Sequence, residues 1–240
     1  MNRMNFGDTR DLFTFDLVRH IMKADPAFDR FTFIPMLTGA DEGARGKKSG
    51  KTDLVKAKKS GKAGSQNLEL VAQMERLQEI EDDLDYFQHI RGYFNKEQIP
   101  AHIVSDQKFT HQDRTRYFGS ISSRLLKNTL IFLDPDTGLE ESRPSEKHLL
   151  FSEVKQIADR MDKNSVLMIY QHLPRVKHDG YIRARCSRLS ELTGLDPLTI
   201  TDNEIIFFLL AKDQKLRTKV EENLERYANS YPLLTSCTDD

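Results

Sequence analysis

Two spacings of apolar residues alternate along this chain of 240 residues. Leu12, Phe15 and Val18 recur at steps of three, which predicts an amphipathic helix over residues 9–24. Residues 31–37 then form a mostly apolar, aromatic run that predicts a buried strand. The alternation continues to a last amphipathic helix around Val220, so the whole chain is built from strands and helices in turn.

The later elements repeat this pattern. Further strands are expected at residues 99–105, 129–133, 165–170, 198–201 and 204–211, and further helices at 66–97, 113–126, 146–161 and 180–192. Strands that alternate with helices form βαβ units. The sequence therefore predicts an α/β fold of Rossmann-like type, with a mainly parallel sheet, helices on both faces and one antiparallel C-terminal strand.

Residues 43–65 interrupt the pattern. Eight basic residues and one acid give this stretch a charge of +7, and the pentapeptide Lys-Lys-Ser-Gly-Lys occurs in it twice, at 47–51 and 58–62. Its low apolar content is typical of a flexible loop. We therefore expect a single domain over residues 1–240, with a basic loop at 43–65 and a long helical segment at 66–97.

Composition narrows the class of protein. The chain is 38% hydrophobic and 30% charged, which excludes disordered and fibrous proteins. Its 36 Lys and Arg nearly balance 37 Asp and Glu, so attraction to nucleic acid has to come from local patches. Cys186 and Cys237 form neither a disulfide framework nor a metal-ligand spacing, and no run is long enough to span a membrane. These features predict a cytoplasmic protein without a membrane partner.

Candidate chemistry follows the strands, because ligands of open parallel sheets bind beyond the carboxyl ends of the strands. Asp134, Pro135 and Asp136 directly follow the apolar strand 129–133, and His172 follows the strand 165–170. A polar turn accounts for the two acids in one interpretation. In another, the segment Asp134-Pro135-Asp136-Thr137-Gly138 resembles the nucleophile loop of haloacid dehalogenase phosphohydrolases, which implies a magnesium-dependent enzyme with Asp134 as nucleophile and Asp136 as acid/base.

Three motifs together carry a second resemblance: Gly7-Asp8-x-x-Asp11, Leu133-Asp-Pro-Asp-x-Gly-Leu-Glu140 and Tyr170-Gln-His-x-Pro-Arg175. With the order of strands and the closing hairpin, the chain resembles the class I S-adenosylmethionine-dependent methyltransferase superfamily over most of its length. The motifs are also similar to those of a bacterial and archaeal group of unassigned function. The first motif resembles the N-terminal segment of the ribosomal-RNA adenine N6-methyltransferases.

The methyltransferase resemblance implies roles for individual residues and requires no metal. Asp134 and Pro135 match the start of the catalytic motif, in which the acid accepts a hydrogen bond from the target amino group, and Asp136 and His172 complete the catalytic candidates. The implied contacts to S-adenosylmethionine are Asp8, Gly39, Asp41 and Asp106. For Asp8 and Asp11, the start of a helix is an equally good explanation.

Basic residues follow the strand 165–170 and indicate a polyanionic substrate. The expected phosphate contacts are Arg175, Lys177, Arg183 and Arg185, although a solvated helix face is the simpler explanation. The favoured hypothesis is methyl transfer from S-adenosylmethionine to a nucleic acid or nucleotide. The alternatives are the phosphohydrolase and a non-catalytic Rossmann-like module that binds a partner.

Overall fold

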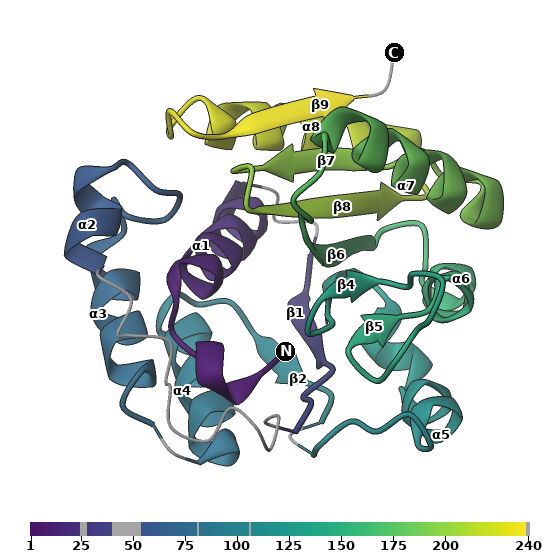
Figure 1. The fold of residues 1–240 in the computed structure, drawn as a ribbon, viewed down its shortest axis with the longest axis horizontal. Helices are drawn as coiled ribbons and strands as arrows, with labels where there is room; N and C mark the ends of the chain where they lie inside the picture. The colour runs from purple at the N-terminus through teal and green to yellow at the C-terminus, as the bar shows by residue number, and fades with distance from the viewer. Residues whose placement is uncertain (25–27, 40–53, 81, 106, 239–240) are drawn as a thin grey trace.

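A seven-stranded sheet in the order β2-β1-β3-β6-β8-β7-β9 forms the centre of the protein (Figure 1). The computed structural model describes residues 1–240 except 25–27, 40–53, 81, 106 and 239–240. The strands of this sheet are β1 (Arg30–Pro35), β2 (Ala101–Ile103), β3 (Thr129–Asp134), β6 (Val166–His172), β7 (Leu198–Thr201), β8 (Ile205–Ala211) and β9 (Thr235–Thr238). A separate two-stranded pair consists of β4 (Gly138–Leu139) and β5 (His148–Leu149).

Strand directions confirm the mainly parallel sheet. β2, β1, β3 and β6 run parallel to one another, and β8 pairs antiparallel with both β6 and β7. The predicted hairpin therefore inserts its second strand, β8, between β6 and its own first strand, β7. β9 pairs antiparallel with β7 at the edge of the sheet, and its polar sequence contains no apolar run that predicts a strand.

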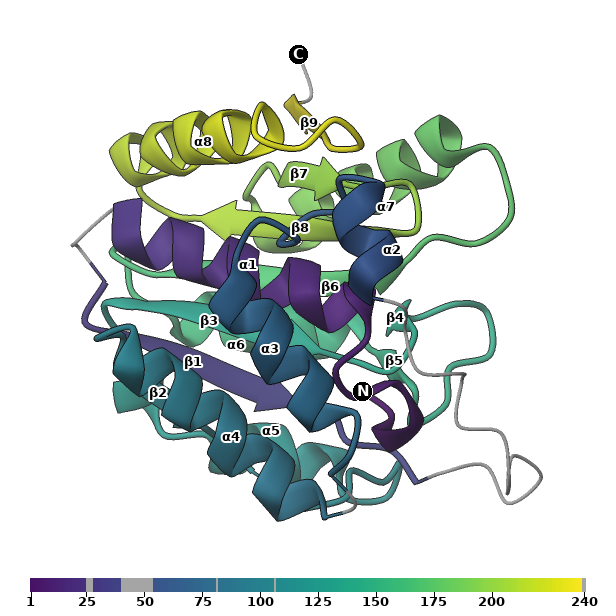
Figure 2. The same cartoon turned by 90° about the vertical axis from the view of Figure 1, so that its left-hand side faces the viewer.

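Helices cover both faces of the sheet, as expected. They are α1 (Thr9–Ala24), α2 (Leu54–Lys59), α3 (Leu68–Leu77), α4 (Asp83–Lys96), α5 (Arg114–Ser120), α6 (Phe151–Arg160), α7 (His178–Thr193) and α8 (Gln214–Ala228), with short 3-10 helices at Arg3–Asn5 and Ser123–Leu126. α1, α3, α4 and α8 cover one face, and α5, α6 and α7 cover the other (Figures 1 and 2).

The strands build two cores because successive side chains point to opposite faces. Leu130 and Phe132 of β3 pack in the core beneath α1, while Ile131 and Leu133 pack in the core beneath α6. All four side chains are at most 1% exposed. Burial on both faces explains why β3 reads as a continuous apolar run rather than as an alternating one.

The expected long helix at 66–97 is wrong, because two helices occupy this segment. Asn67 caps α3 by accepting a hydrogen bond from the Leu70 nitrogen at 3.1 Å, and Asp82 caps α4 by accepting one from the Leu84 nitrogen at 2.6 Å. Both helices turn an apolar face to the same core, so the apolar spacing continues across the break.

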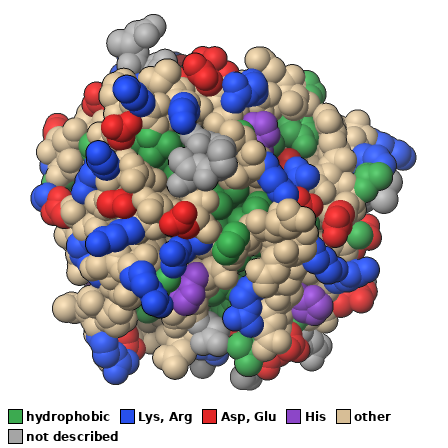
Figure 3. Space-filling view, turned by 180° about the vertical axis from the view of Figure 1, so that it is seen from behind, with side chains coloured by type: hydrophobic (Ala, Val, Ile, Leu, Met, Phe, Trp, Pro, Cys, Tyr) green, Lys and Arg blue, Asp and Glu red, His purple; other side chains and the backbone are tan. Residues whose placement is uncertain are grey.

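The basic segment is also partly helical. Its residues 54–59 form α2, in which Ala57 is 4% exposed, whereas residues 43–53 lie outside the described part of the chain. Over the face seen in Figure 3, basic and acidic side chains are interspersed, in line with the near-zero net charge. None of the described helices is long and apolar enough to cross a lipid bilayer.

Candidate active site

An acidic pocket lies at the carboxyl ends of β1 and β3. The two strands are adjacent, and Pro35 is in register with Asp134. The start of α1 and the segment before it form the other wall. The residues that line the pocket include Met1, Asn2, Asn5, Phe6, Asp8, Arg10, Asp11, Thr14, Asp134, Pro135, Asp136 and Tyr170. Three of the predicted catalytic residues and the predicted cofactor residue Asp8 thus lie together.

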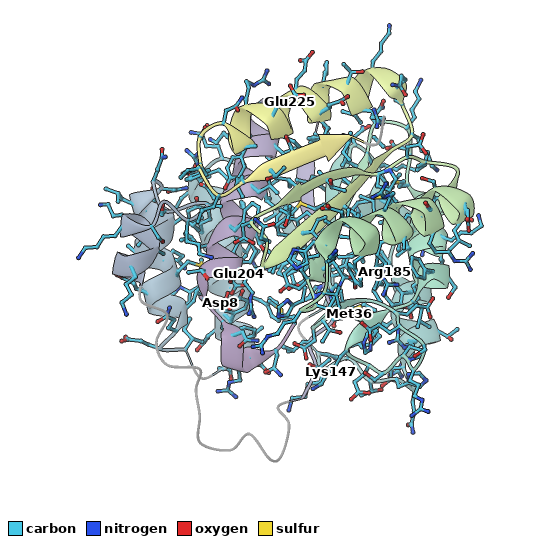
Figure 4. The ribbon with its side chains drawn as sticks, turned by 45° about the horizontal axis from the view of Figure 1, so that its top comes forward. Asp8, Met36, Lys147, Arg185, Glu204 and Glu225 are labelled. Atoms are coloured by element: carbon cyan, nitrogen blue, oxygen red, sulfur yellow. The ribbon has the colours of Figure 1, made fainter. Side chains whose placement is uncertain are left out.

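Other segments reach the same edge of the sheet. Figure 4 shows Asp8, Met36, Lys147 and Glu204 around this edge, with Glu225 of α8 far from them. Glu204 is near enough to Asp8 to raise the pKa of that carboxyl, although burial is the larger cause. The pocket is therefore assembled from segments that are distant in the sequence.

The Gly7-Asp8-x-x-Asp11 motif both starts α1 and lines the pocket. Asp8 Oδ1 accepts hydrogen bonds from the backbone nitrogens of Arg10 at 2.8 Å and Asp11 at 3.0 Å, which is helix capping. Gly7 has φ +75°, and a Cβ there would lie 2.4 Å from the Met74 carbonyl oxygen, so the motif requires glycine. The motif therefore starts the helix and also lines the pocket, and the contact of Asp8 with a cofactor stays a prediction.

Asp11 has a partner that arrives from another helix. Its Oδ2 accepts hydrogen bonds from the Gly7 nitrogen at 2.8 Å and from the Tyr86 hydroxyl of α4 at 2.9 Å. Burial and the neighbouring Asp8 raise the pKa of Asp11 well above its ordinary value. The hydrogen bonds fix the orientation of this carboxyl at the base of the pocket.

An amino group lies at the carboxyl ends of β1 and β3. The amino nitrogen of Met1 lies 3.2 Å from the Met36 carbonyl oxygen and 3.3 Å from that of Asp134, and 4.0 Å from Asp136 Oδ1. Asp136 Oδ2 accepts a hydrogen bond from the Thr38 hydroxyl at 3.1 Å. Two carbonyl oxygens and one carboxylate thus form a cradle for a cationic amine.

Asp134 differs from the other acids of the pocket. Asp134 is 8% exposed, and its carboxylate makes no hydrogen bond with any residue that the structure describes. Burial raises the pKa of Asp134 to about 6, with smaller increases from Asp136 and Asp8 and a decrease from the Met1 amino group. A buried carboxylate with unused acceptors at a strand end is available to a ligand.

The remaining predicted residues lie elsewhere. Gly39 is exposed and does not line the pocket, and Asp41 and Asp106 lie outside the described residues. His172 and Arg175 line a second cavity, to which the next residues of the Asp134 loop contribute. Strand β2, which precedes Asp106, pairs directly with β1.

The predicted phosphate contacts differ in exposure and in their partners. Arg175, Lys177 and Arg183 are exposed. Arg185 donates a hydrogen bond to the Glu140 carbonyl oxygen at 2.7 Å and stacks on Tyr181 with its guanidinium carbon 5.0 Å from the ring centroid. Arg185 therefore ties α7 to the loop after β4, and phosphate binding by these four residues stays a prediction.

Sequence reasoning missed residues that line the pocket, such as Met1, and residues that bond to its acids, such as Thr38 and Tyr86. Met1, Thr38 and Tyr86 reach the site through tertiary contacts, and nothing in their local sequence marks them. Arg10 and Tyr170 also line the pocket, and their positions inside two of the sequence motifs are the local signals that could have identified them. No protein-family model matches the chain, and a search of curated proteins found no match.

Proposed function

We propose that this chain binds S-adenosylmethionine at the carboxyl ends of β1 and β3 and transfers its methyl group to an amino nitrogen of a nucleotide or nucleic acid. The observation that carries the proposal is the acidic pocket at these two adjacent strand ends, with the free carboxylate of Asp134 at its edge. Ligand sites of open parallel sheets lie at such a position.

The topology supports the same proposal. The methyltransferase resemblance rests partly on a closing hairpin that inserts one antiparallel strand, and β8 is inserted in this way between β6 and β7. A Rossmann-like sheet by itself hosts many activities, so topology supports the proposal only together with the pocket.

The acceptors of the pocket fit the charges of the cofactor. S-adenosylmethionine carries an ammonium and a sulfonium, and supplies a methyl group that an amino nitrogen can attack. The Met36 and Asp134 carbonyl oxygens and the Asp136 carboxylate already hold an amino group, and Asp8 adds a further negative charge. The free space beside Met1 is about 40 Å³, room for only a few waters, so Met1 and Asn2 must move for the cofactor to enter.

Asp134 would position the acceptor. Its carboxylate can accept a hydrogen bond from an amino group and so orient the nitrogen lone pair. Because its pKa is raised to about 6, the carboxyl is mostly ionised at pH 7 and becomes protonated below about pH 6. Methyl transfer should therefore fall as the pH drops through this range.

The attachment of the flanks of the basic segment near this edge supports a polyanionic substrate. Lys62, just after α2, pairs with Glu204 and lies 3.7 Å from Asp202 Oδ2, in the turn between β7 and β8. At the other end of the basic segment, Thr38 bonds to Asp136 in the pocket. Both flanks of the +7 segment are thus attached beside the proposed site.

The test is binding of S-adenosylhomocysteine, measured by the thermal midpoint and by calorimetry. A ligand at a hundredfold excess over its Kd stabilises the folded state by about 2.7 kcal/mol. For a chain of this size, that corresponds to a rise of roughly 5 to 10 °C. We expect Asp136→Asn to weaken binding about tenfold and Asp134→Asn to retain binding and lose methyl transfer.

Asp159→Asn, which removes an exposed carboxylate from α6, is the matched control and should bind like the parent. Absence of binding at millimolar ligand contradicts the proposal. A midpoint that rises with magnesium alone would favour the phosphohydrolase, and no response to either would favour the non-catalytic module.

A further inference from the structure

A second cavity adjoins the acidic pocket along the same loop. Asp134, Pro135 and Asp136 line the first, and Thr137 and Leu139 line the second, which has a volume of about 270 Å³. This volume is close to the lower end of the roughly 300 to 1,000 Å³ of small-molecule sites. The loop thus separates two spaces that a cofactor and an acceptor can occupy on either side of it.

The walls of the second cavity are rigid. The side-chain oxygen of Gln171 accepts a hydrogen bond from the Leu139 backbone nitrogen at 2.8 Å, and the backbone nitrogen of His172 donates to the Thr137 carbonyl oxygen at 3.0 Å. Gly138 has φ +131°, and a Cβ there would lie 2.4 Å from the Gln171 amide. These contacts join two of the sequence motifs into one preformed wall.

Two imidazoles of this wall are each held through Nδ1. His148 Nδ1 accepts a hydrogen bond from the Ser145 backbone nitrogen at 3.1 Å, which makes its Nε2 a hydrogen-bond donor. His172 Nδ1 lies 3.1 Å from the Glu204 carbonyl oxygen and donates to it. Neither Nε2 makes a hydrogen bond with the described residues.

A basic side chain, that of Arg175, lies at the rim of the second cavity. Arg175 is exposed and forms no ion pair with the residues that the structure describes. Glu141 is the one acid among the described residues that line the cavity, and Leu173 and Pro174 supply apolar surface. An apolar, hydrogen-bonding cavity with a free guanidinium at its rim matches a planar heterocycle that carries a phosphate.

We infer that this cavity binds a nucleoside monophosphate unit, with the base beside Leu173, Pro174, His148 and His172 and the phosphate on Arg175. As the acceptor subsite of a methyltransferase the inference rests on the proposed function, but nucleotide binding as such does not depend on it.

The test is calorimetric titration of the full chain with adenosine 5′-monophosphate, inorganic phosphate and adenosine. We expect the monophosphate to bind more tightly than either fragment, and Arg175→Gln and His148→Gln each to weaken it about tenfold. Arg188→Gln removes an exposed arginine of α7, the helix that follows Arg175, and this residue does not line the cavity, so the affinity should be unchanged.

Three results would overturn the inference: no binding of the monophosphate, equal affinity in Arg175→Gln, or inorganic phosphate binding as tightly as the nucleotide. S-adenosylhomocysteine is titrated in parallel, and Arg175→Gln should not change its affinity. Nucleotide binding that requires Arg175, without S-adenosylhomocysteine binding, would refute methyl transfer and keep the cavity assignment. The converse result would refute the cavity assignment alone.

Discussion

Asp134→Asn should stabilise the protein at neutral pH, because it removes a buried charge that the Met1 amino group compensates only in part. The pKa of this carboxyl is raised from 3.8 to about 6, chiefly by burial. Below about pH 4 the carboxyl is protonated in the folded and unfolded states alike. Between about pH 4 and 6 the unfolded chain loses this proton first, so the free energy of unfolding falls as the pH rises. A pKa difference of about 2, at roughly 1.4 kcal/mol for each unit, amounts to about 3 kcal/mol.

Urea unfolding followed by circular dichroism from about pH 4 to 7.5 measures this effect. The difference in free energy of unfolding between Asp134→Asn and the parent should grow by about 3 kcal/mol over this range. Asp159→Asn is the control for the loss of one charge, because this side chain is 58% exposed. A difference that stays constant with pH, or shrinks, would refute the reasoning and show that the Asp134 carboxylate is solvated or paired with a cation. A stabilising variant that loses function is the expected signature of a site residue.

Three further substitutions, one of them a control, test the scaffold of the site by urea unfolding. Gly138→Ala should destabilise the protein by about 1 to 3 kcal/mol, because φ is +131° and the new Cβ would overlap the Gln171 amide. Gly180→Ala, in α7 with open space around it, should instead stabilise the protein by about 0.5 to 1 kcal/mol, and the opposite signs separate backbone strain from added bulk. Arg114→Met should lower the free energy of unfolding by about 3 to 5 kcal/mol, because it leaves the buried Glu153 carboxylate without the guanidinium that contacts it at 2.7 Å. A decrease of less than about 1 kcal/mol would show that water reaches this carboxylate.

The fold could be predicted from the sequence wherever a strand is buried on both faces or a hairpin is short. β3, β6 and β8 are continuous apolar runs, and their order along the chain restricts the possible topologies. The division of residues 66–97 could not be inferred from apolar spacing, because α3 and α4 pack on one core and their stripes are in phase. The caps Asn67 and Asp82 are the local signals of that division.

Site residues could be predicted only where they directly follow a buried strand or begin a helix. Asp134 and Asp136 follow a buried strand, and Asp8 starts a helix, so their positions follow from local sequence. The partner of Asp11 is Tyr86, 75 residues away, and the cradle for the amino group consists of backbone carbonyls that no side-chain pattern reports. The hydrogen bond from the Arg185 guanidinium to the Glu140 carbonyl oxygen likewise has no local signal in the sequence.

Charge balance in the pocket leads to one more expectation. Burial raises the pKa of Asp8, Asp11 and Asp134, with Arg10 and the Met1 amino group as the nearby cations, and burial in turn lowers the pKa of that amino group.

A cationic ligand that enters this pocket favours the ionised carboxylates, so its binding should release protons to the solvent. Titration of S-adenosylmethionine near pH 6 in buffers of different ionisation enthalpy measures that release, and the affinity should rise with pH through the same range. Proton uptake on binding, or an affinity that falls as the pH rises, would mean that the ligand does not meet the carboxylates of this pocket.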